Sequence, residues 1–142
     1  MSELSPTQIR ESREKLLDTI DKLNDLLLDK GTELKADEIK EIRRAIIQLS
    51  NAVTELTAKA IEGTAKELSE AVKGIKNATN NANNAMDTLQ DIRDVINIVT
   101  ALVGVGTAIA AGNPAGIISA AEGVLTAVSQ AKKLTKKVQK SN

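Results

Sequence analysis

VINIVTALVGVGTAIAAGNPAGIISAA, residues 95–121, contains no charged side chain. In its middle, Gly112-Asn113-Pro114 predicts a tight turn between two helices. Gly is favoured just after a helix end, Asn is a good N-cap, and Pro is favoured at the first helical position. The stretch therefore predicts an apolar helical hairpin, which the rest of the chain must either bury or deliver to a partner.

The composition of the whole sequence favours helix. Its 142 residues include no Phe, Trp or Tyr and only two prolines. Layers of Ile, Leu, Val and Ala at helical spacing can fill a core, whereas β-sheets normally use aromatic and β-branched cross-strand pairs. We therefore predict an all-α fold in a single domain, residues 1–142.

Four helices are predicted, at residues 6–30, 36–77, 84–111 and 114–140. The first begins at a capping box formed by Ser5 and Gln8, with Pro6 at the first helical position. The second follows an apolar seam that repeats at steps of three and four residues, which is typical of a helix packed in a bundle. The predicted architecture is an antiparallel, up-down four-helix bundle with one longer helix.

The break that ends this long helix has two candidate positions. Residues 77–84 contain five asparagines, and each costs about 0.6 kcal/mol of helix propensity relative to Ala. The rival position is Glu62-Gly63, which precedes a second capping-box pattern formed by Thr64 and Glu67. We place the break at the asparagines, because the seam there contains only alanine.

Charge is distributed unevenly along the chain. Residues 1–94 carry 14 Lys+Arg against 18 Asp+Glu, whereas residues 132–142 carry five lysines and no acid. Such a tail complements the negative end of a helix dipole, or it contacts an anionic lipid surface or an acidic partner. The candidate residues for this contact are Lys132, Lys133, Lys136, Lys137 and Lys140.

The residue inventory argues against enzymatic chemistry. The chain has no His and no Cys, so the commonest general base, the commonest metal ligand and the thiolate nucleophile are missing. Without aromatic stacking platforms and with zero net charge, a nucleic-acid site is not expected either. We predict a non-enzymatic protein with no cofactor, metal or small-molecule substrate. The charged N-terminal sequence is not that of a signal peptide, so a cytoplasmic location is expected.

The uncharged hairpin is the predicted interaction surface, extending over residues 95–131. Each of its two helices keeps a stripe of small or polar residues, and small residues recur every four positions, a spacing that allows two helices to approach closely. The expected partner is a second copy or another protein. The candidate residues are Asn97, Thr100, Gly104, Thr107, Gly112, Gly116, Ser119, Glu122 and Thr126.

Residues 95–112 form an uncharged helix of about 27 Å at 1.5 Å per residue, close to the thickness of a bilayer core. An apolar hairpin inside an otherwise charged helical bundle resembles the α-helical pore-forming toxins of the colicin and cytolysin type. The resemblance covers the last third of the chain and implies that the hairpin leaves the soluble bundle and inserts into lipid. Membrane activity is therefore the alternative function, with an anionic membrane as the partner and peripheral association as the location.

Overall fold

The computed structural model describes residues 2–88 and 91–141, with side chains up to Lys133. Within these residues the chain forms five helices and two short strands. The prediction of an all-α class is confirmed, but the four-helix architecture is not. The elements are β1 (Ser2–Glu3), α1 (Pro6–Lys30), α2 (Ala36–Ala58), β2 (Glu62–Gly63), α3 (Ala65–Thr88), α4 (Ile92–Ala111) and α5 (Pro114–Ser141).

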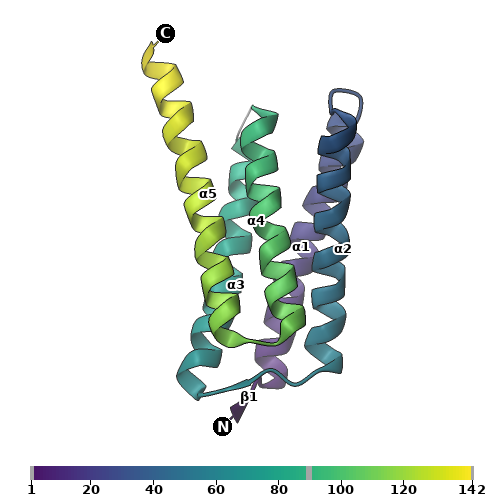
Figure 1. Ribbon diagram of the computed structural model, residues 1–142, viewed down its shortest axis with the longest axis vertical. Coiled ribbons are helices and arrows are strands. Elements are labelled where there is room, and N and C mark those ends of the chain that lie inside the picture. Colours follow the sequence, from purple (N-terminus) through teal and green to yellow (C-terminus); the bar gives the residue numbers. More distant parts are fainter. Residues whose placement is uncertain (1, 89–90, 142) are drawn as a thin grey trace.

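The helices pack in a closed ring whose order differs from the chain order. Going around the ring, α1 is followed by α2, α4, α5 and α3, and α3 packs against α1 again. Figure 1 shows α5, α4 and α2 as one layer, with α3 and α1 behind it. Consecutive helices run in opposite directions, yet three of the five packed pairs are parallel: α1 with α3, α2 with α4, and α3 with α5. The arrangement is therefore not a simple up-down bundle.

Side-chain contacts fix the register of the parallel pairs. Between α1 and α3, Lys15 bonds Asn80 and Thr19 bonds Asn83, so contacting residues differ in number by 64 or 65. Between α2 and α4, the hydroxyl of Thr100 lies 3.3 Å from Glu41 Oε1, a difference of 59. A nearly constant difference is the signature of two helices that run side by side in the same direction.

The core is almost entirely aliphatic, with Met86 and the hydroxyl residues Ser12, Thr19 and Thr79 also buried among the described residues. Every helix contributes buried residues at three- and four-residue steps, as expected for amphipathic helices around a common interior. The largest fully buried side chains come from all five helices and include Leu16, Leu23, Ile42, Leu49, Leu56, Leu68, Ile75, Ile98, Leu102, Ile109 and Ile117.

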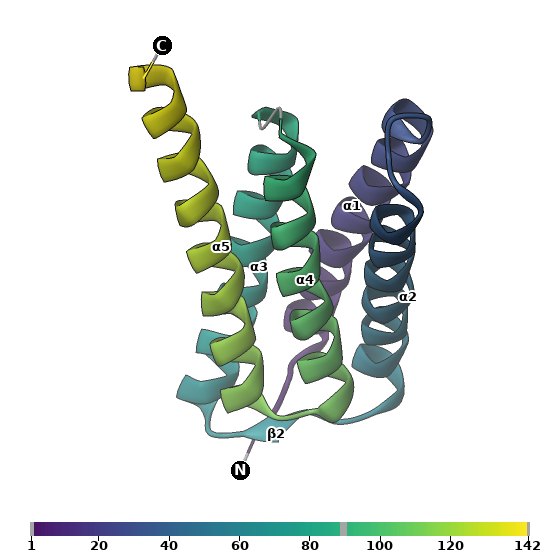
Figure 2. The ribbon, with the colours of Figure 1, turned by 45° about the horizontal axis from the view of Figure 1, so that its top comes forward.

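The break between α2 and α3 lies at the position that we ranked second. Helix α2 ends at Ala58, and α3 starts after a capping box in which Thr64 Oγ1 accepts from the Glu67 N–H (3.1 Å) and Glu67 Oε1 accepts from the Thr64 N–H (3.0 Å). Hydrogen bonding from the backbone N–H and then from the side chain of Thr64 lowers the pKa of the Glu67 carboxyl. The intervening segment crosses the end of the bundle (Figure 2), where β2 pairs with β1.

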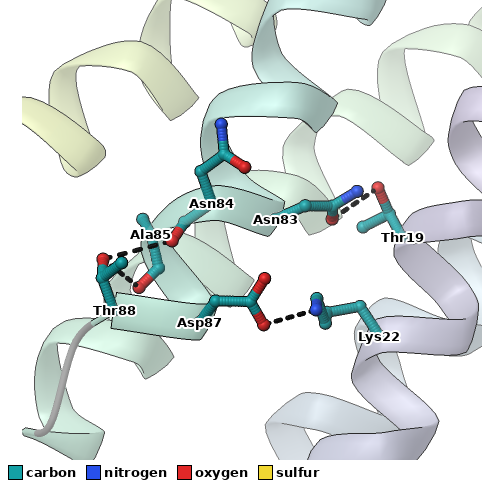
Figure 3. A network of polar contacts seen from close by, with 7 residues as sticks. All are labelled: Thr19, Lys22, Asn83, Asn84, Ala85, Asp87 and Thr88. Atoms are coloured by element: carbon teal, nitrogen blue, oxygen red, sulfur yellow. Dashed lines mark hydrogen bonds and ion pairs between the residues drawn. The ribbon is translucent and has the colours of Figure 1, made fainter.

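The prediction of a break at the asparagines is wrong, because α3 runs through all five of them. Ala78, Ala82 and Ala85, which lie within or next to this stretch, are completely buried. They follow Gly74 at steps of four, eight and eleven residues, so they share the side of α3 on which a Cβ at Gly74 would lie 3.1 Å from Ala121 of α5. Asn80 and Asn83 lie on a different side of α3, where each contacts a side chain of α1. Figure 3 shows Asn83 facing Thr19, whose hydroxyl lies 3.1 Å from Asn83 Oδ1.

Ion pairs flank the same contact between α1 and α3. Lys22 pairs with Asp87 (Figure 3), and Lys76 pairs with Glu11. The hydrogen bond and the charge of Lys76 lower the pKa of Glu11. Packing and polar contacts therefore offset the poor helix propensity of the asparagines. Helix α3 instead continues to Thr88. Helix α4 begins at Ile92, with Asp91 as its N-cap, and not at residue 84 as predicted.

Candidate interaction surface on the α4–α5 hairpin

The turn between α4 and α5 has the predicted chemistry. Gly112 adopts φ 75°, in the left-handed region that favours glycine, and its N–H donates to the carbonyl of Ile109 (3.0 Å). Asn113 Oδ1 accepts from the N–H of Ala115 (3.0 Å), and Pro114 is the first residue of α5. The turn thus fixes the two helices as an antiparallel hairpin, α4–α5.

The inner side of the hairpin accounts for most of its apolar character. Helix α4 is the only helix of the described residues that is long and apolar enough to cross a membrane, with a mean hydropathy of 1.8. Its large aliphatic residues nevertheless point into the core, and α5 contributes a matching buried row. The buried residues are Val95, Ile98, Val99, Leu102, Val103, Val105 and Ile109 of α4, and Ile117, Ala121, Val124, Val128 and Ala131 of α5.

The outer side carries most of the predicted interaction residues. We call it the hairpin face and define it by seven exposed candidates and one exposed glycine that the sequence reasoning did not single out. These residues are Asn97, Thr100, Gly104 and Thr107 of α4, and Ser119, Glu122, Gly123 and Thr126 of α5. The two remaining candidates, Gly112 and Gly116, are half-buried in and beside the turn.

The threonines make the hairpin face less polar than its sequence suggests. Thr107 Oγ1 donates to the Val103 carbonyl (2.9 Å), and Thr100 Oγ1 lies 3.0 Å from the Ile96 carbonyl. Such bonds to the preceding turn satisfy the hydroxyl within its own helix. The hairpin face therefore offers methyl groups and small side chains, with Glu122 as its one charged member.

The glycines of this region belong to two classes. A Cβ at Gly106 would lie 2.9 Å from the Gln48 carbonyl, and a Cβ at Gly74 would lie 3.1 Å from Ala121 Cβ, so these two glycines allow helices of the ring to approach each other. Gly116 similarly faces Ala108 across the hairpin, at 3.9 Å. At Gly104 and Gly123, in contrast, a Cβ would meet nothing within 4 Å.

Sequence spacing could not separate these two classes. The four-residue repeat included Gly104 and Gly116 but omitted Gly106, at which a Cβ would lie 2.9 Å from the backbone of the neighbouring helix α2. A glycine inside a helix signals a special role, because it is about 1 kcal/mol less favourable there than Ala. That signal marks Gly106 and Gly123 as well, but it does not say which neighbour each glycine faces.

The lysine tail is only partly described. Lys132 and Lys133 are exposed near the end of α5. Lys136, Lys137 and Lys140, the other predicted contacts for an anionic surface, lie outside the residues whose side chains the structure describes. The location of the tail contact therefore stays a prediction.

The described residues do not gather ligands for a metal: no group of three or more Asp or Glu side chains converges on a common point among them. No protein-family model, curated protein or solved structure matches the chain.

Proposed function

We propose that the protein is non-enzymatic and acts by self-association through the hairpin face of α4–α5. A different helical protein with a matching small-residue surface would use the same face. Three properties support this proposal: the face is exposed, it is nearly uncharged, and small residues and threonine methyl groups dominate it. Surfaces of this kind allow two helices to pack at short range.

The observation that carries the proposal is the open space beside two helical glycines, Gly104 and Gly123, where an added Cβ would meet nothing within 4 Å. Gly104 and Gly123 lie inside helices, where each is about 1 kcal/mol less favourable than Ala. Gly74 and Gly106 offset this cost through a close helix contact within the chain, but Gly104 and Gly123 have no such contact. Both lie on the exposed side of the hairpin, so a backbone that approaches them must come from another molecule.

The second candidate function is membrane activity, and the length and hydropathy of α4 favour it. Insertion would require α4 to leave the core, because its aliphatic side is packed against α2 and α5. It would also bring Glu122 toward lipid, and a charge at the centre of a spanning helix costs about 2.5–3.5 kcal/mol. The exposed Lys132 and Lys133 would then serve as contacts for anionic headgroups.

Sedimentation velocity of the full chain tests the proposal. The informative variant is Thr107→Lys, which places a charge where association would remove it from water without a partner. The matched control is Ser69→Lys, at an exposed position of α3. We expect the wild type and the control to associate through the hairpin face, and Thr107→Lys to lose that association while its far-ultraviolet circular dichroism stays unchanged.

The membrane alternative is tested with the same variants by measuring the dye that they release from anionic vesicles. Dye release by the wild type that Thr107→Lys abolishes, without any self-association in solution, would replace the proposal by its alternative. A wild type that stays monomeric at high concentration and leaves vesicles intact would contradict both functions.

A further inference from the structure

A second surface of the molecule is distinct from the hairpin face. It carries the exposed large hydrophobic residues of the described chain: Leu17 (44% exposed), Leu28 (82%) and Ile47 (59%). All three lie on α1 or α2, which are packed together on the side of the ring away from α5 (Figure 2). Exposed apolar side chains that gather on one hairpin point to a contact surface.

The positions of these residues along the α1–α2 hairpin are set by its short loop. The two helices are antiparallel, so residues equally far from the loop lie at the same level. Leu17 is then level with the region around Ile47, and Leu28 is level with the first turn of α2. Here α2 borders an open hollow, which is lined by Ala36, Asp37, Ile39, Lys40, Glu41, Arg43, Arg44 and Ile47.

Opposite charges flank the apolar residues on the two helices. Along α1, five exposed carboxylates recur at three- and four-residue steps, and none pairs with another described side chain. Along α2, the exposed charged side chains on the N-terminal side of Ile47 include Lys40, Arg43 and Arg44, of which Arg44 lies 4.0 Å from Glu41. The five carboxylates of α1 are Glu14, Asp18, Asp21, Asp25 and Asp29.

We propose that a second copy of the chain docks on this α1–α2 face around a two-fold axis parallel to the helices. Such an axis places α1 of each copy against α2 of the other and keeps residues at their own level. Asp21 and Asp25 of one copy then face Arg44 of the second copy. Leu28 enters the hollow beside Ile39 of the second copy, and the same contacts occur twice.

The size of the face suits such a dimer. Helix α1 has 25 residues and α2 has 23, so each is about 35 Å long at 1.5 Å per residue. Two adjacent helices of about 10 Å width cover about 700 Å² per copy, close to the roughly 800 Å² per partner of a standard interface. Charge complementarity between the exposed carboxylates of α1 and the exposed Lys40, Arg43 and Arg44 of α2 provides orientation and selectivity.

The inference does not rest on the hairpin face. In the ring, α5 lies opposite the contact between α1 and α2, whereas α4 borders α2, where Thr100 of the hairpin face lies 3.3 Å from Glu41. The two surfaces therefore meet at this edge, but the residues named for each surface are different. A chain that uses both surfaces assembles beyond a dimer, whereas a chain with only one active surface stops at a dimer.

The test uses the full chain with Thr107→Lys, which blocks the hairpin face and isolates the α1–α2 face. Sedimentation equilibrium compares this background with two charge reversals, Arg43→Glu with Arg44→Glu, and Asp21→Lys with Asp25→Lys. All four positions are exposed, so helical content and melting temperature serve as the folding control. We expect the background to be a dimer and each reversal to raise the dissociation constant about tenfold or more, because like charges then face each other.

An equimolar mixture of the two reversals sharpens the test. In the mixed dimer each reversed helix meets a reversed partner, so association should return to the level of the background. Exposed charge pairs weaken with salt, so dimerisation should also decline between about 0.1 M and 1 M salt. A Thr107→Lys background that is monomeric in low salt would overturn the inference, as would a dimer that both reversals leave intact.

Discussion

Two of the three parallel helix contacts, α2 with α4 and α1 with α3, are held together in different ways. Between α2 and α4, aliphatic side chains such as Leu49 and Leu102 fill the core, and Gly106 lets the backbones approach. Between α1 and α3, asparagines, lysines and carboxylates bond across the contact, while the buried alanines of α3 lie on the side of Gly74, which faces α5. The comparison teaches that a segment with poor helix propensity stays helical when its small residues face a neighbour and its polar residues find partners.

The largest effect is expected in the aliphatic contact. Leu49→Ala removes a fully buried side chain and should lower the free energy of unfolding by about 2–5 kcal/mol. Ile46→Ala, at a half-buried position on the same helix, should cost less. Urea denaturation of the two variants gives both values, and an equal loss for both would contradict the placement of α2.

Two glycines of α4 provide the next comparison. Gly106→Ala should destabilise the fold by about 1–3 kcal/mol, because the new Cβ would lie 2.9 Å from the Gln48 carbonyl, a backbone group that cannot turn away. Gly104→Ala should stabilise it by up to about 1 kcal/mol, since its Cβ meets open space. Thermal melts of dilute protein measure both, and the same sign for both variants would contradict the assigned faces of α4.

Two neighbouring asparagines of α3, Asn83 and Asn84, test the contact between α1 and α3. Asn84 is exposed and has no side-chain partner among the described residues, so Asn84→Ala should gain about 0.6 kcal/mol of helix propensity. Asn83→Ala gains the same amount but loses its contact with Thr19, which is worth about 0.5–1.5 kcal/mol. Denaturant titration should therefore show a stabilised Asn84→Ala and a nearly neutral or destabilised Asn83→Ala. The reverse order would mean that the polar contacts with α1 do not support α3.

The smallest effect is expected from acid. Because Lys76 lowers the pKa of Glu11 below its ordinary 4.5, the unfolded state takes up this proton more readily than the folded state. The stabilisation is thus complete above about pH 4.5 and is lost as the pH falls through the lower folded value. Lys76→Gln should reduce the slope of stability against pH in this range. A slope that is unchanged in this variant would show that the ion pair does not contribute.

Features set by adjacent residues could be predicted from the sequence. The capping box of Ser5 and Gln8 and the turn at Gly112-Asn113-Pro114 depend on local hydrogen bonds and backbone angles, and the structure contains both. The break before α3 also had a local signal in Thr64 and Glu67, but the low helix propensity of the five asparagines favoured the other position.

Features set by a distant neighbour could not be predicted. The helix across the asparagines is supported by α1, which is about 65 residues away in sequence. Likewise, the sequence does not reveal that Gly106 faces α2 while Gly104 faces outward, because helix periodicity gives a face but not its neighbour. The ring order, in which α2 packs on α4 and not on α3, also depends on contacts between distant parts of the sequence, so it could not be predicted.

Cysteine crosslinking at Gly104 tests the central claim, self-association through the hairpin face, most directly. The chain has no cysteine, so Gly104→Cys introduces a unique thiol on the hairpin face, and Ser69→Cys introduces one at an exposed control position of α3. We expect mild oxidation to convert Gly104→Cys to a disulfide-linked dimer much faster than Ser69→Cys, with the difference lost when Thr107→Lys is added. Equal rates for the two cysteines, or a fast reaction that survives Thr107→Lys, would contradict the account.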